Sequence, residues 1–428
     1  MAAAAGERRD SVAFAMSVAF AALVYTVPAE WWPEVAVIRP ALLTSGLTIG
    51  LMLARRVGLR ERFLLDGVRG GALAVLSLLA LSSVGWGVAP TEARDGALEL
   101  CKLALFYLAL VNVVSTPRRL EGMVLAMLAA SLVTSVGTLR WYQSGVDLVE
   151  GYRARWYGVY ADPNRMAMNL LVIIPLAAAF AVNAALRPWK RLLALAAGGL
   201  AVACLVVSHS RGGMMGLALG LGLWALRERA HRGRALLVGA GLGLALAIFA
   251  PRSFWERSET VGQYEQDASA MGRVYGWQVA SRISLDRPLL GVGMNGFRYA
   301  WPHYAPPEAL VHYQALVSHN LFLDVVSELG WLGLGLFLVF AGGAVGSAFI
   351  ASGDGQVGWI ARGLAASVAG YLVTQLSAGY LLSSHLYLLF GLAAAARRLS
   401  QEASTRGERE CPVTPRPGAT VPSASHSS

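Results

Sequence analysis

Apolar residues recur along the chain in blocks close to 20 residues long, separated by shorter polar segments. A helix of about 20 residues crosses the apolar core of a bilayer, so each block predicts a transmembrane helix. Twelve are predicted, at residues 11–27, 36–53, 71–88, 97–114, 121–138, 167–186, 192–207, 213–226, 235–250, 319–350, 359–377 and 380–396. The pattern therefore predicts an all-α polytopic membrane protein.

The polar segments complete this plan. Residues 1–398 form a predicted membrane domain with two long connections, at about 139–166 and 251–318. The block at 319–350 is too long for one simple span, so we expect it to start at the membrane surface or to tilt. Residues 399–428 are rich in Ser, Thr, Pro and charge, which predicts a disordered tail on the cytoplasmic side.

The composition excludes a soluble protein. Apolar residues make up 56% of the chain and charged residues only 14%, whereas average soluble proteins carry about 25% charged residues. A soluble chain of this composition could not cover its own surface with polar groups. The three cysteines show neither a pairing pattern nor the spacing of metal ligands.

The formal net charge of +10 arises from 36 basic and 26 acidic residues. In a soluble protein this excess would suggest nucleic acid, but in a membrane protein topology is the first explanation, because cytoplasmic loops retain Arg and Lys. With a cytoplasmic N-terminus, 22 of the 36 basic residues fall in cytoplasmic segments. Both termini are therefore predicted to be cytoplasmic and both long connections periplasmic, and no nucleic-acid partner is expected.

Topology does not explain the arginines predicted on the periplasmic side, because there they oppose the positive-inside rule. A phosphate or polyanion would explain such a set. Each one alone could instead extend to lipid headgroups or pair with an acidic side chain of the loops. As a set they favour a phosphate site; they are Arg140, Arg153, Arg155, Arg165, Arg211, Arg252, Arg257, Arg273, Arg282, Arg287 and Arg298.

Two tight turns between apolar blocks contain candidate site residues. The sequence SHSRGG at 208–213 places Arg211 at the start of a helix, whose N-terminal amides attract anions. Gly213 and the glycines that follow favour helix packing, and His209 is interpreted as structural. The sequence DPN at 162–164 is a turn and helix-start signal. The aromatic residues before it suit either the membrane interface or stacking on sugars.

The second long connection contains two further candidates. A helix is predicted at 273–283, with Arg273 at its start and Trp277 and Ile283 among its apolar contacts. The glycine-rich stretch GVGMNG at 291–296 follows. It is not interpreted as a nucleotide-binding loop, because no strand–helix unit surrounds it and the connection is periplasmic.

His319 and Asn320 open the tenth apolar block. A histidine at this position can be neutral at pH 7 and accept a proton, although simple hydrogen bonding is an equal alternative. Asp324 and Glu328 lie further into the same block, where carboxylates are costly and usually face a polar cavity or a partner. One of them could orient the imidazole or pair with an arginine.

Together these motifs resemble the O-antigen ligase / O-antigen polymerase family of bacterial membrane glycosyltransferases. The resemblance covers about residues 155–345. It rests on the DPN turn, the SRGG turn, the loop from Arg273 to the glycines at 291 and 293, and His319-Asn320. The last motif is the most specific, because nine residues separate Asn320 from a Gly-x-x-Gly sequence that begins at Gly330.

The resemblance implies a GT-C-like fold of about twelve helices, with a large periplasmic loop between the ninth and tenth. It implies an undecaprenyl-diphosphate-linked glycan as donor, with Arg211 and Arg273 binding the diphosphate. By similarity, His319 would activate, or help position, the acceptor hydroxyl. No metal or other cofactor is expected. The possible supporting residues are Arg155, Asp162, Asn164, Asn320 and Asp324.

Several functions are compatible with this resemblance. A ligase would transfer a finished glycan to lipid A–core or a similar acceptor at the periplasmic face of the bacterial inner membrane. A polymerase would join lipid-linked repeats of O-antigen or exopolysaccharide, and other relatives glycosylate proteins. A non-enzymatic transporter of lipid-linked glycans is a further alternative. Two features oppose it: the sequence shows no duplicated halves, and the reactive residues gather at one membrane face.

Overall fold

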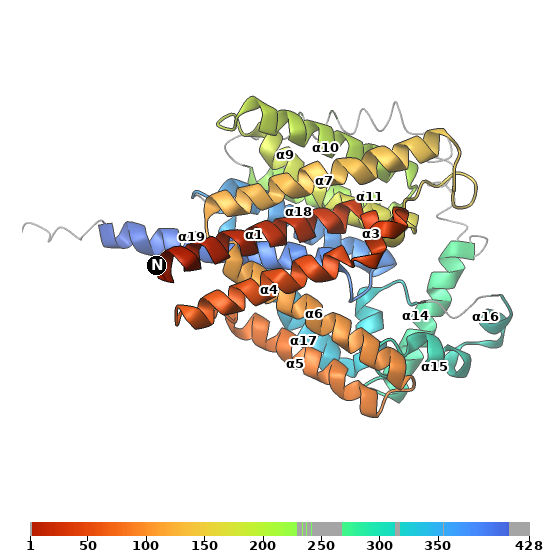
Figure 1. Ribbon diagram of the computed structural model, residues 1–428. Helices are drawn as coiled ribbons and strands as arrows, with labels where there is room; N and C mark the ends of the chain where they lie inside the picture. Colours follow the sequence, from red (N-terminus) through yellow and green to blue (C-terminus); the bar gives the residue numbers. More distant parts are fainter. Residues whose placement is uncertain are drawn as a thin grey trace, which may run out of the picture.

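The computed structural model describes residues 2–228, 268–312, 317–353 and 355–410, together with Gly233, Leu237 and Gly241. Across these residues the chain folds into helices joined by turns and loops, and the only strand-like pairing is an isolated bridge between Val149 and Arg153. The prediction of an all-α protein is therefore confirmed (Figure 1).

The α-helices run in an order that matches the apolar blocks. They are α1 (Ala2–Thr26), α2 (Pro28–Trp31), α3 (Pro33–Val37), α4 (Pro40–Gly58), α5 (Gly67–Ser82), α6 (Pro90–Val113), α7 (Pro117–Gln143), α8 (Pro163–Leu171), α9 (Ile173–Val182), α10 (Pro188–Val207), α11 (Arg211–Arg227), α14 (Ala268–Asp286), α15 (Phe297–Tyr304), α16 (Pro307–His312), α17 (Leu321–Ala351), α18 (Gly358–Ala378) and α19 (Ser384–Glu410).

Eleven of the twelve predicted spans coincide with described helices, the sixth being divided between α8 and α9. The predicted span at 235–250 lies outside the described residues. Among the residues that the structure describes, seven helical segments are long and apolar enough to cross a membrane, which supports a polytopic membrane protein. These are Pro33–Gly58, Gly67–Gly85, Pro90–Val113, Pro117–Gln143, Pro163–Val182, Pro188–Val207 and Leu321–Ala351.

The helices run roughly side by side, so the bundle has two ends. Figure 1 shows the N-terminus and the last turns of α19 at one end, here called the terminal end. At the opposite end, here called the loop end, lie α14, α15 and α16. The start of α1 and the end of α19 share one end, which is the arrangement that an even number of crossings produces.

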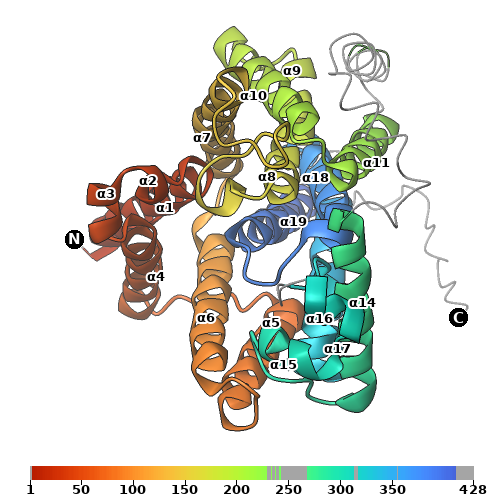
Figure 2. The same ribbon diagram turned by 90° about the vertical axis from the view of Figure 1, so that its right-hand side faces the viewer.

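The core of the bundle surrounds α19. Its segment from Leu386 to Ala396 is buried at almost every position and reads LYLLFGLAAAA. A helix that is apolar on all faces is stable only when other helices enclose it. In Figure 2, α19 lies centrally, with α6, α17 and α18 around it.

The helix α17 is broken at Gly330, whose backbone φ of 68° is not helical. Its 31 residues would measure about 46 Å as one straight helix, against an apolar bilayer core of about 30 Å. The loop before α15 bonds to the break: the amide of Val292 donates to Ser327 O (2.9 Å) and that of Trp331 donates to Pro288 O (2.8 Å). The extra length is therefore divided at a backbone break, while a start at the membrane surface or a tilt stays a prediction.

The C-terminal helix also extends beyond the expected boundary. Residues 399–410, predicted to begin a disordered tail, continue α19 to Glu410. An ion pair one helical turn apart, between Arg398 and Glu402 (3.7 Å), supports this extension. Residues 411–428 lie outside the described residues, so disorder there stays a prediction.

Candidate functional site

A cavity of about 160 Å³ lies where four elements meet toward the loop end. Arg211, Arg273 and Asn164 all line it, although they lie far apart in the sequence. They come from the starts of α11 and α8 and from α14. The remaining lining residues are His209, Gly212, Met215 and Ser377. The structure thus brings together both predicted diphosphate-binding arginines and one predicted supporting residue.

The turn before α11 fixes the position of Arg211. Ser210 caps the helix, and its Oγ accepts a hydrogen bond from the amide of Gly213 (3.2 Å). A Cβ on Gly212 would lie too close to Oγ of Ser377 on α18, so that hydroxyl would have to rotate away. Arg211 is the first residue of α11, so its positive charge adds to that of the helix N-terminus.

The glycines that follow let α11 approach its neighbours closely. A Cβ on Gly216 would lie 2.6 Å from the carbonyl oxygen of Gly370 in α18, and one on Gly220 would lie 3.0 Å from that of Ala366. On Gly213 it would lie 2.8 Å from Cβ of Ala167 in α8. The interpretation of these glycines as a packing face is therefore confirmed.

Asp162 and Asn164 organise the start of α8. One carboxylate oxygen of Asp162 accepts hydrogen bonds from the amides of Asn164 (2.8 Å) and Arg165 (2.9 Å), so the DPN turn is the helix N-cap that the sequence indicates. The side chain of Asn164 then lines the cavity. Arg165 lies over the ring of Tyr380, 4.4 Å from its centre, a contact that the sequence did not indicate.

Arg153 connects the two turns that line the cavity. It is only 2% exposed. Its Nε donates to the carbonyl of Ser208 (3.0 Å), and its Nη2 donates to Oδ1 of Asn164 (2.9 Å). The sequence singled out Arg155 instead. That residue is partly exposed, pairs with Asp147, and is not among the residues that line the cavity.

His319 lies just before α17, with a left-handed backbone (φ 57°). Burial is the largest of the causes that together lower the pKa of its imidazole to about 4; the positive charges of Arg273 and Arg165 act in the same direction, and Asp162 opposes them. These interactions place His319 in the same electrostatic environment as Arg273 of the cavity. The imidazole is therefore neutral at pH 7, as a proton acceptor must be.

Asn320 and Asp324 hold the backbone around His319. The side-chain oxygen of Asn320 caps α17 by accepting from the amides of Phe322 (3.0 Å) and Leu323 (3.2 Å). The carboxylate of Asp324 accepts from the amide of Ser318 (3.1 Å). Both residues thus fix the turn that carries the histidine, whereas orientation of the imidazole by Asp324 stays a hypothesis.

Within the described residues, Glu328 neither orients the imidazole nor pairs with an arginine, the two roles that the sequence suggests. Its carboxylate accepts from the amides of Asn295 (2.9 Å) and Phe297 (3.4 Å). It therefore anchors the GVGMNG loop against α17. Positive φ angles at Gly291 (71°) and Gly293 (95°) allow this close approach, so the loop has a structural role.

The helix that carries Arg273 is longer than predicted. α14 begins at Ala268, so Arg273 lies in its second turn rather than at its start. Ile283 is buried in a small apolar cluster with Phe297 and Trp301. Trp277, predicted to make apolar contacts, is 38% exposed instead.

The chemistry available at the cavity is anion binding; His319 does not line the cavity, but its imidazole responds to the charge of Arg273. Two guanidinium groups and a helix N-terminus favour a phosphate or diphosphate. Within the described parts of the chain, no group of three or more His, Cys, Asp or Glu side chains is placed to hold a metal ion.

Comparison with known families agrees with this geometry. Residues 196–338 match the family model described as O-antigen ligase. This part of the chain is similar to the O-antigen ligase family. It contains Arg211, Arg273 and His319, whereas Asn164 precedes it. The resemblance predicted from the motifs is confirmed.

The chain is also similar to a curated protein over a stretch longer than residues 196–338. The chain is 25% identical over 280 residues to a protein named exopolysaccharide production protein ExoQ, from Rhizobium meliloti (strain 1021). The aligned region covers 60% of this chain and 60% of that relative's own length. The two comparisons therefore show similarity to an O-antigen ligase family and to a protein named for exopolysaccharide production.

Proposed function

We propose that the protein transfers a glycan from undecaprenyl diphosphate to an acceptor hydroxyl, in the manner of an O-antigen ligase. The proposed location is the periplasmic face of the bacterial inner membrane, with lipid A–core or a similar glycan as acceptor. The observation that carries the proposal is the cavity in which Arg211 and Arg273 converge, with the neutral His319 close to Arg273.

The proposed reaction replaces one bond to the anomeric carbon with another. The acceptor oxygen bonds to this carbon as the bond from the carbon to the diphosphate oxygen breaks. The electron pair leaves with the diphosphate, so negative charge grows there. Arg211, Arg273 and the N-terminus of α11 stabilise that charge with dipoles and cations that are already in place.

In the same proposal His319 accepts the proton of the acceptor hydroxyl as it attacks. A base must be unprotonated at the working pH, and the lowered pKa of His319 meets this requirement. Asn320 and Asp324 act as positioning residues, because they hold the backbone on both sides of the histidine.

A second candidate function is polymerisation, in which the acceptor hydroxyl belongs to another lipid-linked glycan. The similarity to an exopolysaccharide production protein favours it. The chemistry at the anomeric carbon is the same, so the site residues have the same roles and only the acceptor differs.

The deciding experiment is a deletion strain whose surface and lipid-linked glycans are separated by gel electrophoresis. Long lipid-linked chains together with unmodified core indicate a lost ligase, and single-repeat products indicate a lost polymerase. Complementation with Arg211→Ala, Arg273→Ala or His319→Ala is expected to fail while the protein still inserts. A variant that fully restores the glycans removes its residue from the proposed site.

The membrane face is tested separately by labelling single cysteines introduced at positions 273 and 319 with an impermeant reagent in intact spheroplasts. Labelling from outside is expected at both positions. Labelling only after lysis would contradict both the periplasmic site and the donor chemistry proposed for it.

A further inference from the structure

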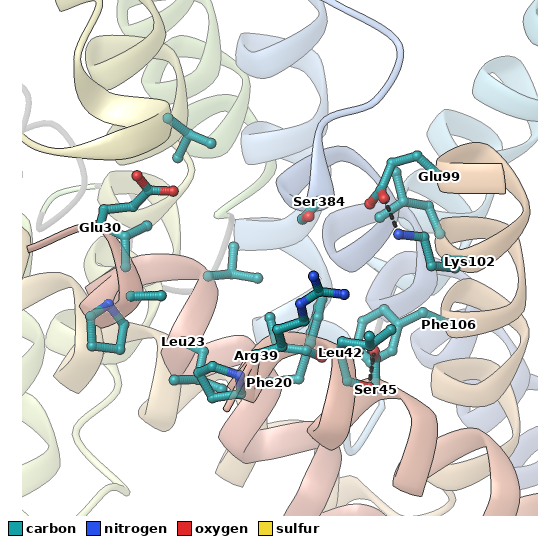
Figure 3. A pocket seen from close by; sticks show the side chains of 18 of the residues that line it. Phe20, Leu23, Glu30, Arg39, Leu42, Ser45, Glu99, Lys102, Phe106 and Ser384 are labelled. Atoms are coloured by element: carbon teal, nitrogen blue, oxygen red, sulfur yellow. Dashed lines mark hydrogen bonds and ion pairs between the residues drawn. The ribbon is translucent and has the colours of Figure 1, made fainter. Parts of the chain in front are cut away.

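A second cavity, of about 640 Å³, lies between α1, α4, α6 and the start of α19 (Figure 3). Its volume falls within the range of about 300–1,000 Å³ that is typical of ligand pockets. Phe20, Leu23, Leu42 and Phe106 contribute apolar walls. The outer wall is α4, in which only Thr48 and Met52 are buried.

The position of α4 opens this apolar space toward the surface of the bundle. Leu43 and Leu47 on α4 and Leu98 and Leu105 on α6 are exposed large apolar side chains. In a membrane protein such surfaces face lipid chains, so a lipid can reach the cavity without crossing water. The cavity is therefore suited to an apolar chain.

Two basic and two acidic side chains also line the cavity, and they are Arg39, Lys102, Glu30 and Glu99. Figure 3 shows the guanidinium of Arg39 directed into it, toward Ser384. Within the described residues, Arg39 makes no side-chain hydrogen bond or ion pair. Lys102 lines the same cavity and pairs with Glu99 on its own helix. In such a pocket the apolar walls can enclose an apolar chain, and the arginine can bind a phosphate attached to that chain.

One segment separates this cavity from the site of Arg211 and Arg273. Val159 lines the second cavity, whereas Asn164, five residues later, lines the first. Between them, Oη of Tyr160 is hydrogen-bonded to Nε2 of His385 (2.9 Å), and His385 also lines the second cavity. The short segment from Val159 to Asn164 therefore contributes a lining residue to each cavity.

We propose that this second cavity is a second lipid-phosphate site, in which Arg39 binds the phosphate and the α1, α4 and α6 side chains enclose the apolar chain. The lipid there anchors the acceptor, while the donor diphosphate occupies the site of Arg211 and Arg273. Only the naming of this lipid as the acceptor's anchor rests on the proposed function. The binding site itself is measurable without glycan transfer.

Native mass spectrometry of the full chain in detergent tests this proposal, with undecaprenyl phosphate as the probe. The wild-type protein is expected to bind two molecules. Arg39→Gln is expected to weaken one of the two binding events about tenfold, because a charge-assisted hydrogen bond is lost, and Arg39→Lys is expected to restore much of it. Ala41→Trp, which fills the cavity, is expected to remove the same event.

The matched control is Arg94→Gln, at an exposed arginine that pairs with Asp95 outside the cavity, and it is expected to leave both events unchanged. Two bound lipids of unchanged affinity in both Arg39→Gln and Ala41→Trp would overturn the second site. Arg211→Gln is expected to weaken only the other event. If it weakens neither, the proposed donor site fails while the second site stands.

Competition with phosphatidylglycerol identifies the source of the phosphate. If the Arg39-dependent event persists in excess phosphatidylglycerol, the site prefers a polyprenyl phosphate. If phosphatidylglycerol replaces the probe there, the phosphate comes from a glycerophospholipid. Either result supports a lipid-phosphate site, whereas displacement of the probe by inorganic phosphate alone contradicts it.

Discussion

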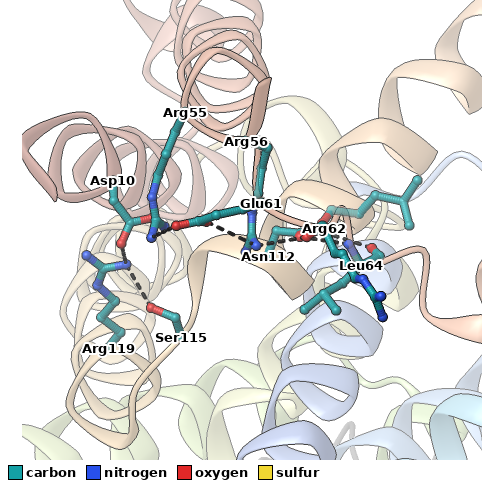
Figure 4. A network of polar contacts seen from close by, with 10 residues as sticks. Asp10, Arg55, Arg56, Glu61, Arg62, Leu64, Asn112, Ser115 and Arg119 are labelled. Atoms are coloured by element: carbon teal, nitrogen blue, oxygen red, sulfur yellow. Dashed lines mark hydrogen bonds and ion pairs between the residues drawn. The ribbon is translucent and has the colours of Figure 1, made fainter. Parts of the chain in front are cut away.

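The two ends of the bundle use arginine differently. At the terminal end Asp10 lies between two arginines, with its oxygens 2.5 Å from Nη1 of Arg55 and 2.5 Å from Nη1 of Arg119 (Figure 4). At the loop end Arg211 and Arg273 converge on one cavity with Asn164 and Ser377. The first arrangement joins helices α1, α4 and α7, whereas the second concentrates positive charge in one small space.

This difference distinguishes structural arginines from candidate ligand-binding ones. A carboxylate between two arginines offsets part of their charge and holds helix ends together. Two arginines that line the same cavity offer several guanidinium N–H donors to one space, which is an arrangement that suits a phosphate. Net charge alone cannot separate the two cases, because both ends contain arginine.

The sharpest test compares one arginine from each end. Arg273→Gln is expected to lower the rate of glycan transfer about 100- to 1,000-fold, because a fixed group that stabilises the departing diphosphate is lost. Arg55→Gln is expected to leave the rate per folded molecule nearly unchanged. The measurement is transfer by purified protein with a lipid-linked donor. Equal losses in the two variants would remove the distinction between the ends.

Asp10→Asn tests the structural role of the terminal end. It leaves Arg55 and Arg119 without their shared carboxylate in a partly buried setting, so the free energy of unfolding is expected to fall by about 1–3 kcal/mol. Asp95→Asn is the control, because its pair with Arg94 is exposed and is expected to contribute under about 1 kcal/mol. Denaturation in detergent measures both, and identical stabilities would contradict the prediction.

Two glycines of α11 differ in their surroundings: one is closely packed and the other borders open space. Gly216→Ala forces a Cβ to 2.6 Å from Gly370 O, which is expected to cost about 1–3 kcal/mol. A Cβ on Gly222 meets nothing within 4 Å, so Gly222→Ala is expected to stabilise the helix by about 0.5–1 kcal/mol. The thermal midpoints of the two variants should therefore move in opposite directions.

The smallest expected effect is on the titration of His319. Its pKa is lowered to about 4, so the imidazole stays neutral as the pH falls from 8 to 5. Arg273→Gln removes a positive charge that lowers this pKa, so the pKa should rise toward the ordinary value of about 6.5. The variant should then lose reactivity toward diethylpyrocarbonate at pH 5 relative to pH 8, measured on the peptide that contains His319. A flat profile in the variant would show that Arg273 does not act on the histidine.

The sequence predicts the helices well because membrane spans are set by local apolar length. It also places Arg211 and Asn164 at one end, since both lie at turns between consecutive apolar blocks. Family motifs add Arg273 and His319. Their roles in chemistry stay predictions that the variants above test.

Sequence reasoning misses features that depend on contacts between distant segments. Nothing local shows that Arg153 is buried while Arg155, two residues away, is partly exposed and pairs with Asp147. The break at Gly330 likewise depends on a loop some forty residues earlier. That loop forms hydrogen bonds with the backbone amides and carbonyls of α17 that the break leaves without helical partners. In the same way, Glu328 contacts that loop rather than an arginine or the histidine.

The loop anchored by Glu328 also constrains the order in which the protein can assemble during synthesis. The amide of Val88, after α5, donates to the carbonyl of Val292 (2.9 Å), and the amide of Val292 donates to Ser327 in α17. The turn between α5 and α6 therefore cannot form this hydrogen bond until about 200 later residues have been synthesised. Such long-range closure is slow, so the early helices must remain in the membrane with that turn unfinished until α17 has been inserted.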